Sequence, residues 1–176
     1  MTNTPLTDEQ IYGHASPQHD KRYVRDLSFF RDTIHSPSRV LYPCCNIDAT
    51  PVKAFPDAHI DFLDDSPEKV AMFKRRGLDA VCADVNTATF DAPHDLVLWI
   101  NPGFMPSNDT VLRYSSSDGY IIGDNHYWTG RNLLDSDAVR LVGMIRDIDP
   151  KLTTDPEVIK DIMRTDVRSL MIFQKK

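Results

Sequence analysis

Short apolar segments alternate with helical segments along most of this 176-residue chain, and this alternation restricts the fold more than any other feature. Two helix starts are marked by capping residues before a proline at the first helical position: Thr50 precedes Pro51, and an Asp-Asp-Ser run at 64–66 precedes Pro67. Strands that alternate with helices indicate a parallel sheet built from right-handed crossovers. The apolar runs expected to form buried strands are residues 39–42, 59–63, 79–83, 95–100 and 119–123.

The segments at the two ends complete one domain. Residues 20–35 carry an apolar stripe at helical spacing. Apolar runs at 141–145 and 167–173 are expected to form an antiparallel edge hairpin, with a helix between them that begins at Asp155-Pro156. The fourth run, 95–100, does not alternate between polar and apolar residues, which is typical of strands covered on both faces. We therefore expect an α/β three-layer sandwich around a mostly parallel central sheet of about seven strands. Residues 1–19 would form a flexible arm, and 20–176 a single domain.

Composition and missing motifs exclude several functions. A net charge of −6 argues against a large nucleic-acid interface. The absence of G-x-G-x-x-G, G-x-x-x-x-G-K-[ST] and G-x-S-x-G disfavours a nicotinamide dehydrogenase, a P-loop phosphotransferase and a nucleophile-elbow hydrolase. Three cysteines without a C-x-x-C, and scattered histidines, predict no metal site. Without a signal-peptide pattern or a membrane-spanning apolar run, we expect a cytoplasmic protein with a small-molecule substrate and no membrane partner.

Polar residues stand at the carboxyl end of each expected parallel strand. In an open α/β sheet these ends meet at one crevice, where ligands bind. Helix capping is the alternative explanation, because Asp, Asn and Ser are favoured in every strand-to-helix loop. Asp64 has the strongest case: it lies 21 residues after Pro43, the spacing at which a carboxylate accepts hydrogen bonds from ribose. Of the pair Asp64 and Asp65, we expect one to cap the following helix and the other to face the crevice. The strand-end residues are Asp48, Asp64 or Asp65, Asp84, Asn101 and Asp124.

Over residues 36–176, this order of elements resembles the class I S-adenosylmethionine-dependent methyltransferases, which have a Rossmann-like fold. The resemblance implies S-adenosylmethionine as cofactor. The loop after the first strand would wrap the methionine portion, with Tyr42, Pro43, Asn46 and Asp48 as the matching residues. The resemblance further implies that Asp64 or Asp65 binds the ribose, and that Asp84 with Val85 faces the adenine.

The segment Asn101-Pro102-Gly103-Phe104 is similar to the Asn/Asp-Pro-Pro-Tyr/Phe motif of methyltransferases that act on amino groups. There, the Asn side chain and the proline carbonyl accept hydrogen bonds from the target amine, and the aromatic ring stacks on the target plane. The similarity implies a small or planar acceptor held by Asn101, Pro102 and Phe104; the alternative is a tight turn with Phe104 packed on the core. After the fifth strand, His126 has a suitable place for proton transfer, unless its loop folds its aromatic residues onto the sheet edge.

The first loop departs from the family pattern because it contains no glycine. Residues 42–48 read Tyr-Pro-Cys-Cys-Asn-Ile-Asp, with Cys44 and Asn46 where related loops carry glycine. Asn46 can adopt a positive φ, and we interpret Cys44 and Cys45 as small buried hydrophobic residues rather than nucleophiles. Three functions stay open: a methyltransferase, a catalytically degenerate protein of the same fold that binds a nucleotide-like ligand or a protein partner, and an unrelated Rossmann-like nucleotide-binding protein.

Overall fold

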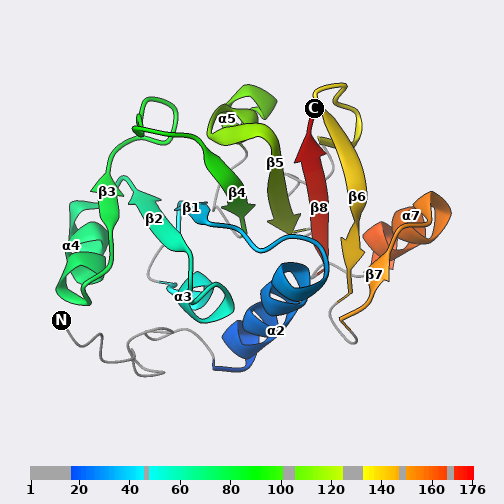
Figure 1. The fold of residues 1–176 in the computed structure, drawn as a ribbon, viewed down its shortest axis with the longest axis horizontal. Coiled ribbons are helices and arrows are strands. Elements are labelled where there is room, and N and C mark those ends of the chain that lie inside the picture. The colour runs from blue at the N-terminus through cyan, green and yellow to red at the C-terminus, as the bar shows by residue number, and fades with distance from the viewer. Residues whose placement is uncertain (1–16, 46–47, 101–105, 125–132, 147–149, 166–168) are drawn as a thin grey trace.

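A computed structural model gives the arrangement of the chain (Figure 1). It describes residues 17–45, 48–100, 106–124, 133–146, 150–165 and 169–176. One mixed sheet has the strand order β3-β2-β1-β4-β5-β8-β6-β7. The pairs among β1 to β5 are parallel, whereas β8 is antiparallel to both β5 and β6. The expected α/β sandwich with a mostly parallel sheet is confirmed.

The strands follow the expected apolar runs closely. They are β1 (Arg39–Pro43), β2 (His59–Asp64), β3 (Ala80–Cys82), β4 (His94–Trp99), β5 (Ser115–Asp124), β6 (Val139–Ile145), β7 (Leu152–Thr153) and β8 (Leu170–Lys175). No sequence pattern indicated β7, because two residues are too few to show a period. The expected closing pair is β6 and β8, and β8 lies between β5 and β6 rather than at the edge.

Helices connect or flank these strands throughout the described ranges. They are α2 (Pro17–Thr33), α3 (Thr50–Ala54), α4 (Pro67–Arg75), α5 (Asn108–Arg113) and α7 (Pro156–Thr165). The start of α4 has the expected cap and proline. Ser66 caps it and accepts a hydrogen bond from the Lys69 amide, so neither acid of the Asp64–Asp65 pair is the cap. Gly77, just after the C-cap, has φ 75°, a conformation that favours glycine.

The start of α3 corrects one expectation. Ala49, not Thr50, is the N-cap residue, and its side chain makes no capping hydrogen bond. Thr50 is already helical, and its backbone amide donates to Asp48 Oδ1 at 2.8 Å. Asp48 therefore satisfies the first amide of the helix, and the Thr50 hydroxyl donates to Asp48 instead of capping a later amide.

Each face of the sheet is covered by its own hydrophobic cluster. Alternate residues of β4 illustrate this, because Leu96 and Leu98 belong to one cluster and Val97 and Trp99 to the other. The first cluster includes buried side chains of α2, α3 and α4, and the second includes those of α5 and α7. This explains why the fourth apolar run lacks alternation. Among the described residues, no helix is both long and apolar enough to span a membrane.

Candidate active site at the carboxyl edge of the sheet

The chain leaves β1 in a left-handed conformation. Cys44 has φ 54°, and its backbone amide donates to the Leu63 carbonyl of β2 at 2.6 Å. The next residue, Cys45, is buried with its thiol 3.8 Å from the same carbonyl. A positive φ is the conformation that glycine adopts most readily. Cys44 therefore has a glycine-like backbone conformation while carrying a side chain, and it is one of the two positions where the sequence lacks the expected glycine.

Carboxylates at and after the end of β2, and in the loop after β3, act electrostatically on the Cys44 thiol. Burial raises the pKa of Cys44 to about 12, and the negative charges of Asp64, Asp65 and Asp84 add to that effect, whereas Lys69 opposes it. The side chains expected to meet at this edge therefore lie close enough for their charges to act on one atom. At neutral pH the thiol stays protonated, in line with its interpretation as a hydrophobic residue.

Asp48 holds the two ends of the first loop together. One of its oxygens accepts from the Tyr42 hydroxyl at 2.9 Å, and the other accepts from the backbone amide and the hydroxyl of Thr50. Burial raises the pKa of Asp48, and the hydrogen bonds from Thr50 and Tyr42 partly offset that effect. Tyr42 is itself buried, and Pro43 is buried as the last residue of β1. Asp48 and Tyr42 thus brace the loop that the resemblance assigns to the cofactor.

The two acids at the end of β2 differ in their surroundings. Asp64 is only 5% exposed, accepts from the Ser66 amide at 3.0 Å and lies 3.5 Å from the Lys69 ammonium. Asp65 is exposed, and its backbone carbonyl accepts from the Cys82 thiol. The Asp64 carboxylate is held in a fixed position beside β1, while that of Asp65 has solvent around it.

The loop after β3 is held by contacts with the core. Asp84 is exposed and its Oδ1 accepts from the amide and the side chain of Asn86, at 2.7 and 2.9 Å. Val85 is buried in the second cluster. Its carbonyl accepts from the Tyr114 hydroxyl, which also donates to the Ala88 carbonyl at 3.2 Å. The loop expected to face an adenine is therefore anchored on the core by a tyrosine that the sequence did not single out.

Helix α2 contributes to the same edge. Burial raises the pKa of Tyr23 to about 12, and the charges of Asp124 at the end of β5 and of Asp48 add to that effect. Further along, Phe30 of α2 and the following His35 contact Tyr120 near the middle of β5. The helix therefore runs over the first cluster with Tyr23 toward the carboxyl ends of the strands. Tyr23 was expected only as part of an apolar stripe.

Several expected site residues lie outside the described part of the chain. These are Asn46, Asn101, Pro102, Phe104 and His126. In the ranges that the structure does describe, no group of three or more His, Cys, Asp or Glu side chains is arranged to hold a metal ion.

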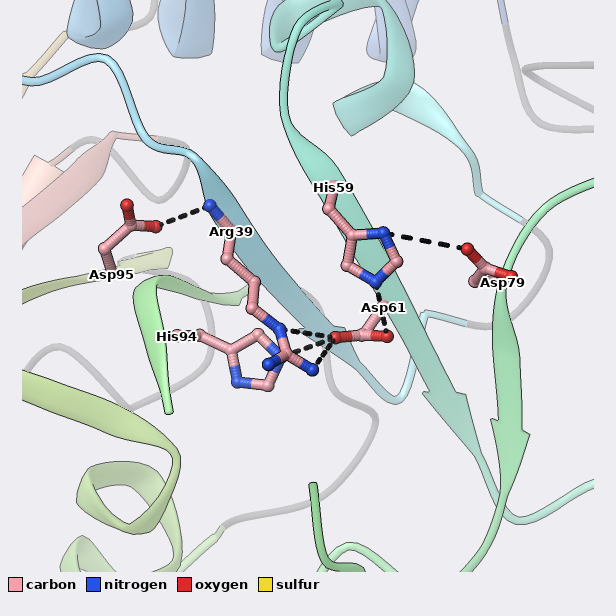
Figure 2. A network of polar contacts seen from close by, with 6 residues as sticks. All are labelled: Arg39, His59, Asp61, Asp79, His94 and Asp95. Atoms are coloured by element: carbon pink, nitrogen blue, oxygen red, sulfur yellow. Dashed lines mark hydrogen bonds and ion pairs between the residues drawn. The ribbon is translucent and has the colours of Figure 1, made fainter. Parts of the chain in front are cut away.

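A second polar network lies at the opposite, amino-terminal edge (Figure 2). Asp61 of β2 accepts from His94 Nε2 at 2.8 Å and from Arg39 Nε and Nη2 at 3.1 and 3.0 Å, and it lies 3.1 Å from His59 Nε2. Asp95 accepts from the Arg39 amide at 2.9 Å. Burial opposes ionisation of Asp61, but the hydrogen bonds from His94 and Arg39, with the charge of His59, outweigh it and lower the pKa to about 2. The network joins β1, β2 and β4 and is remote from the carboxyl edge.

Comparison with solved structures identifies the architecture. The N-methyltransferase NodS from Bradyrhizobium japonicum WM9, in complex with S-adenosyl-L-homocysteine, superposes with a TM-score of 0.62 over 96% of each chain at 12% identity. This chain has the Rossmann-like fold of the class I methyltransferases. The plantazolicin methyltransferase BpumL, in complex with SAH, gives a TM-score of 0.58 at 13% identity, covering 96% of this chain and 93% of that one. The StiE O-methyltransferase segment 942–1257 gives 0.61 at 15% identity, covering 89% and 74%.

The sequence alone shows no detectable overall similarity to known families. No protein-family model matches this chain, and no curated protein matches it. The likeness to these methyltransferases therefore lies in the arrangement of strands and helices rather than in overall similarity of sequence.

Proposed function

We propose that this protein is an S-adenosylmethionine-dependent methyltransferase that acts on a small molecule, with an amino group as methyl acceptor. The observation that carries the proposal is the register of β1, β2 and β3, which puts Cys44, Asp64 and Asp84 at or just after neighbouring strand ends on the carboxyl edge of a methyltransferase fold. NodS and BpumL, which share that fold, are known in complex with SAH. The donor set fits the group: carboxylates suit ribose hydroxyls and an adenine amine, and a buried loop suits the methionine portion.

Asp64 is proposed to accept the ribose hydroxyls. Its carboxylate is held by the Ser66 amide and Lys69, and a carboxylate has about four lone-pair sites, so it can accept further hydrogen bonds without leaving that position. Asp84 is proposed to face the adenine, with Val85 fixing its loop on the core. Asp48 and Tyr42 are proposed to act by holding the first loop in place.

The proposed contacts with the methyl acceptor rest on the sequence motif at residues 101–104. Asn101 and the Pro102 carbonyl are proposed to accept hydrogen bonds from the acceptor amine and so direct its lone pair, with Phe104 stacked on the acceptor plane. The bound cofactor supplies an electrophilic methyl group. The new bond from the amine nitrogen to the methyl carbon would form as the bond from sulfur to that carbon breaks, with S-adenosyl-L-homocysteine as the leaving group. The nitrogen would then lose a proton, which His126 is proposed to receive.

Titration calorimetry with S-adenosyl-L-homocysteine tests the proposal. We expect the wild-type protein to bind, Asp64→Asn to bind at least tenfold more weakly, and Asp65→Asn to stay within threefold of wild type. The asparagine side chain keeps the volume and one acceptor oxygen for the Ser66 amide, so the loss would report the missing charge and acceptor. A melting temperature for each variant controls for folding. No binding by the wild type at millimolar ligand would refute the function, and equal effects of the two variants would refute the assignment to Asp64.

A further inference from the structure

A groove opens at the carboxyl end of β6, beside the start of α7. It has a volume of about 430 Å³ and is lined by Arg146, residues 151–155 and Val158. This volume is within the range of small-molecule sites. Figure 1 places β6, β7 and α7 together at the end of the sheet opposite β3. The groove is therefore separate from the candidate cofactor site beside β1, β2 and β3.

The strand register places this groove on the same edge of the sheet as the candidate active site. Because β8 is antiparallel to both β5 and β6, those two strands run in the same direction. Leu170 of β8 pairs with Asp124 on one side and with Ile145 on the other. Two interstrand steps of roughly 4.8 Å put the ends of β5 and β6 about 10 Å apart. The groove therefore opens on the same edge of the sheet as the end of β5.

The charge of the groove differs from that of the rest of this edge. Strands β2 and β5 end on the acids Asp64 and Asp124, whereas the groove exposes Arg146 and Lys151. Within the described ranges, neither cation belongs to an ion pair (Asp147 and Asp149 lie outside those ranges). Among the described lining residues the only carboxylate is that of Asp155, whose Oδ1 accepts from the amides of Glu157 and Val158 and neutralises the positive start of α7. Among the described lining residues, positive side chains therefore outnumber carboxylates by two to one.

The remaining lining adds hydrogen-bond donors and two apolar side chains, Leu152 and Val158. Thr153 and Thr154 supply hydroxyl groups. Val158 on the first turn of α7 is 42% exposed, unusually high for a large apolar side chain in this structure, and it forms part of the groove wall. Cations with hydroxyl donors and an apolar wall suit an anionic group carried on a carbon chain.

We propose that this groove binds a carboxylate or phosphate group of the methyl acceptor, an assignment that rests on the proposed methyltransferase function. The acceptor would then carry its anionic group about three interstrand steps, roughly 14 Å, from the end of β4, after which the acceptor motif follows. The substrate class that follows is an anionic amine, rather than a neutral or cationic one.

The test is a titration of isotopically labelled full-length protein with inorganic phosphate and, separately, with succinate, at constant ionic strength, read by amide chemical shifts. We expect saturable amide shifts at Thr153, Thr154 and Val158. The anion that binds with the higher affinity shows whether the groove prefers phosphate or carboxylate. The double variant Arg146→Gln/Lys151→Gln should weaken that binding at least fivefold. The matched control Arg140→Gln/Lys160→Gln removes two exposed cations of β6 and α7 that lie outside the groove lining, and it should leave the binding unchanged.

Each other outcome overturns a defined part of the proposal. Shifts that do not saturate, or equal weakening in both double variants, would overturn the anion site. Binding of S-adenosyl-L-homocysteine to the same samples is measured in parallel, and the groove variant should retain it. If that ligand binds but the anions do not, only the groove assignment fails. If the anions bind but S-adenosyl-L-homocysteine does not, the methyltransferase proposal fails and takes the acceptor assignment with it.

Discussion

Replacing Cys44 with glycine and with alanine should reverse the usual stability order of those two residues. Alanine is normally the more stable, since glycine loses more backbone entropy on folding, at a cost of about 0.5–1 kcal/mol. At φ 54°, however, a residue with a Cβ is strained by about 1–2 kcal/mol, and only glycine relieves that strain. Both variants lose the same half-buried thiol, so its packing cancels in the comparison. We expect Cys44→Gly to be more stable than Cys44→Ala by about 1 kcal/mol.

Urea unfolding at neutral pH under reducing conditions measures this difference, which corresponds to a melting-temperature gap of about 2–4 °C for a chain of this size. The matched pair is Cys82→Gly and Cys82→Ala in β3, where the residue is exposed and has no positive φ. There alanine should be the more stable. The reasoning fails if Cys44→Ala equals or exceeds Cys44→Gly in stability, or if the two positions give the same order.

Three further changes test other contacts. Asp61→Asn should lower the free energy of unfolding by about 2 kcal/mol at neutral pH, because the pKa of Asp61 is about 2 in the folded protein against an ordinary value of 3.8. The stability difference between wild type and variant should be full above about pH 4 and should shrink as the pH falls toward 2. A difference that stays constant over that pH range in urea unfolding would contradict the reasoning. Gly143→Ala should lower the free energy of unfolding by about 1–3 kcal/mol, since the added Cβ would lie 2.8 Å from the Thr153 carbonyl oxygen. An unchanged midpoint in urea unfolding would show that β7 can move aside without loss of stability. Tyr114→Phe should cost about 1–2 kcal/mol and speed amide exchange near Val85, and unaltered exchange would mean that the hydroxyl does not anchor the loop.

Local patterns were sufficient for most of the fold. The unbroken apolar run of β4 indicated a strand covered on both faces, and the structure divides Leu96 and Val97 between the two clusters. Ser66 and Pro67 marked the start of α4, and Gly77 its end. These signals lie within one element, so no knowledge of the tertiary structure was needed. The two-residue β7 and the central place of β8 depend on long-range pairing, which leaves no local trace.

Local sequence patterns predicted only part of the candidate site. Strand-end acids pointed to the carboxyl edge, and the charges of Asp64, Asp65 and Asp84 do act on one thiol there. Cys44 has a positive φ that its residue type did not indicate, because the preference of a residue type cannot show which position a turn requires; Asn46, which can also adopt one, lies outside the described residues.

Asp61 could have been recognised from the sequence as a buried acid that needs partners. A carboxylate inside an otherwise apolar strand needs buried partners, and His94 and Arg39 supply them. Both partners come from neighbouring strands, so the need could be seen in the sequence while the identity of the partners could not.

The place of β8 has a consequence for how the molecule assembles during synthesis. Every other strand of the described sheet precedes it in the chain, yet it supplies the pairing that joins β5 to β6. A polypeptide emerging from the ribosome therefore holds two incomplete half-sheets with unpaired backbone edges until this last strand is released. Such edges are templates for association with other chains. Chaperone dependence and aggregation of this protein should accordingly be greatest in nascent or C-terminally shortened chains.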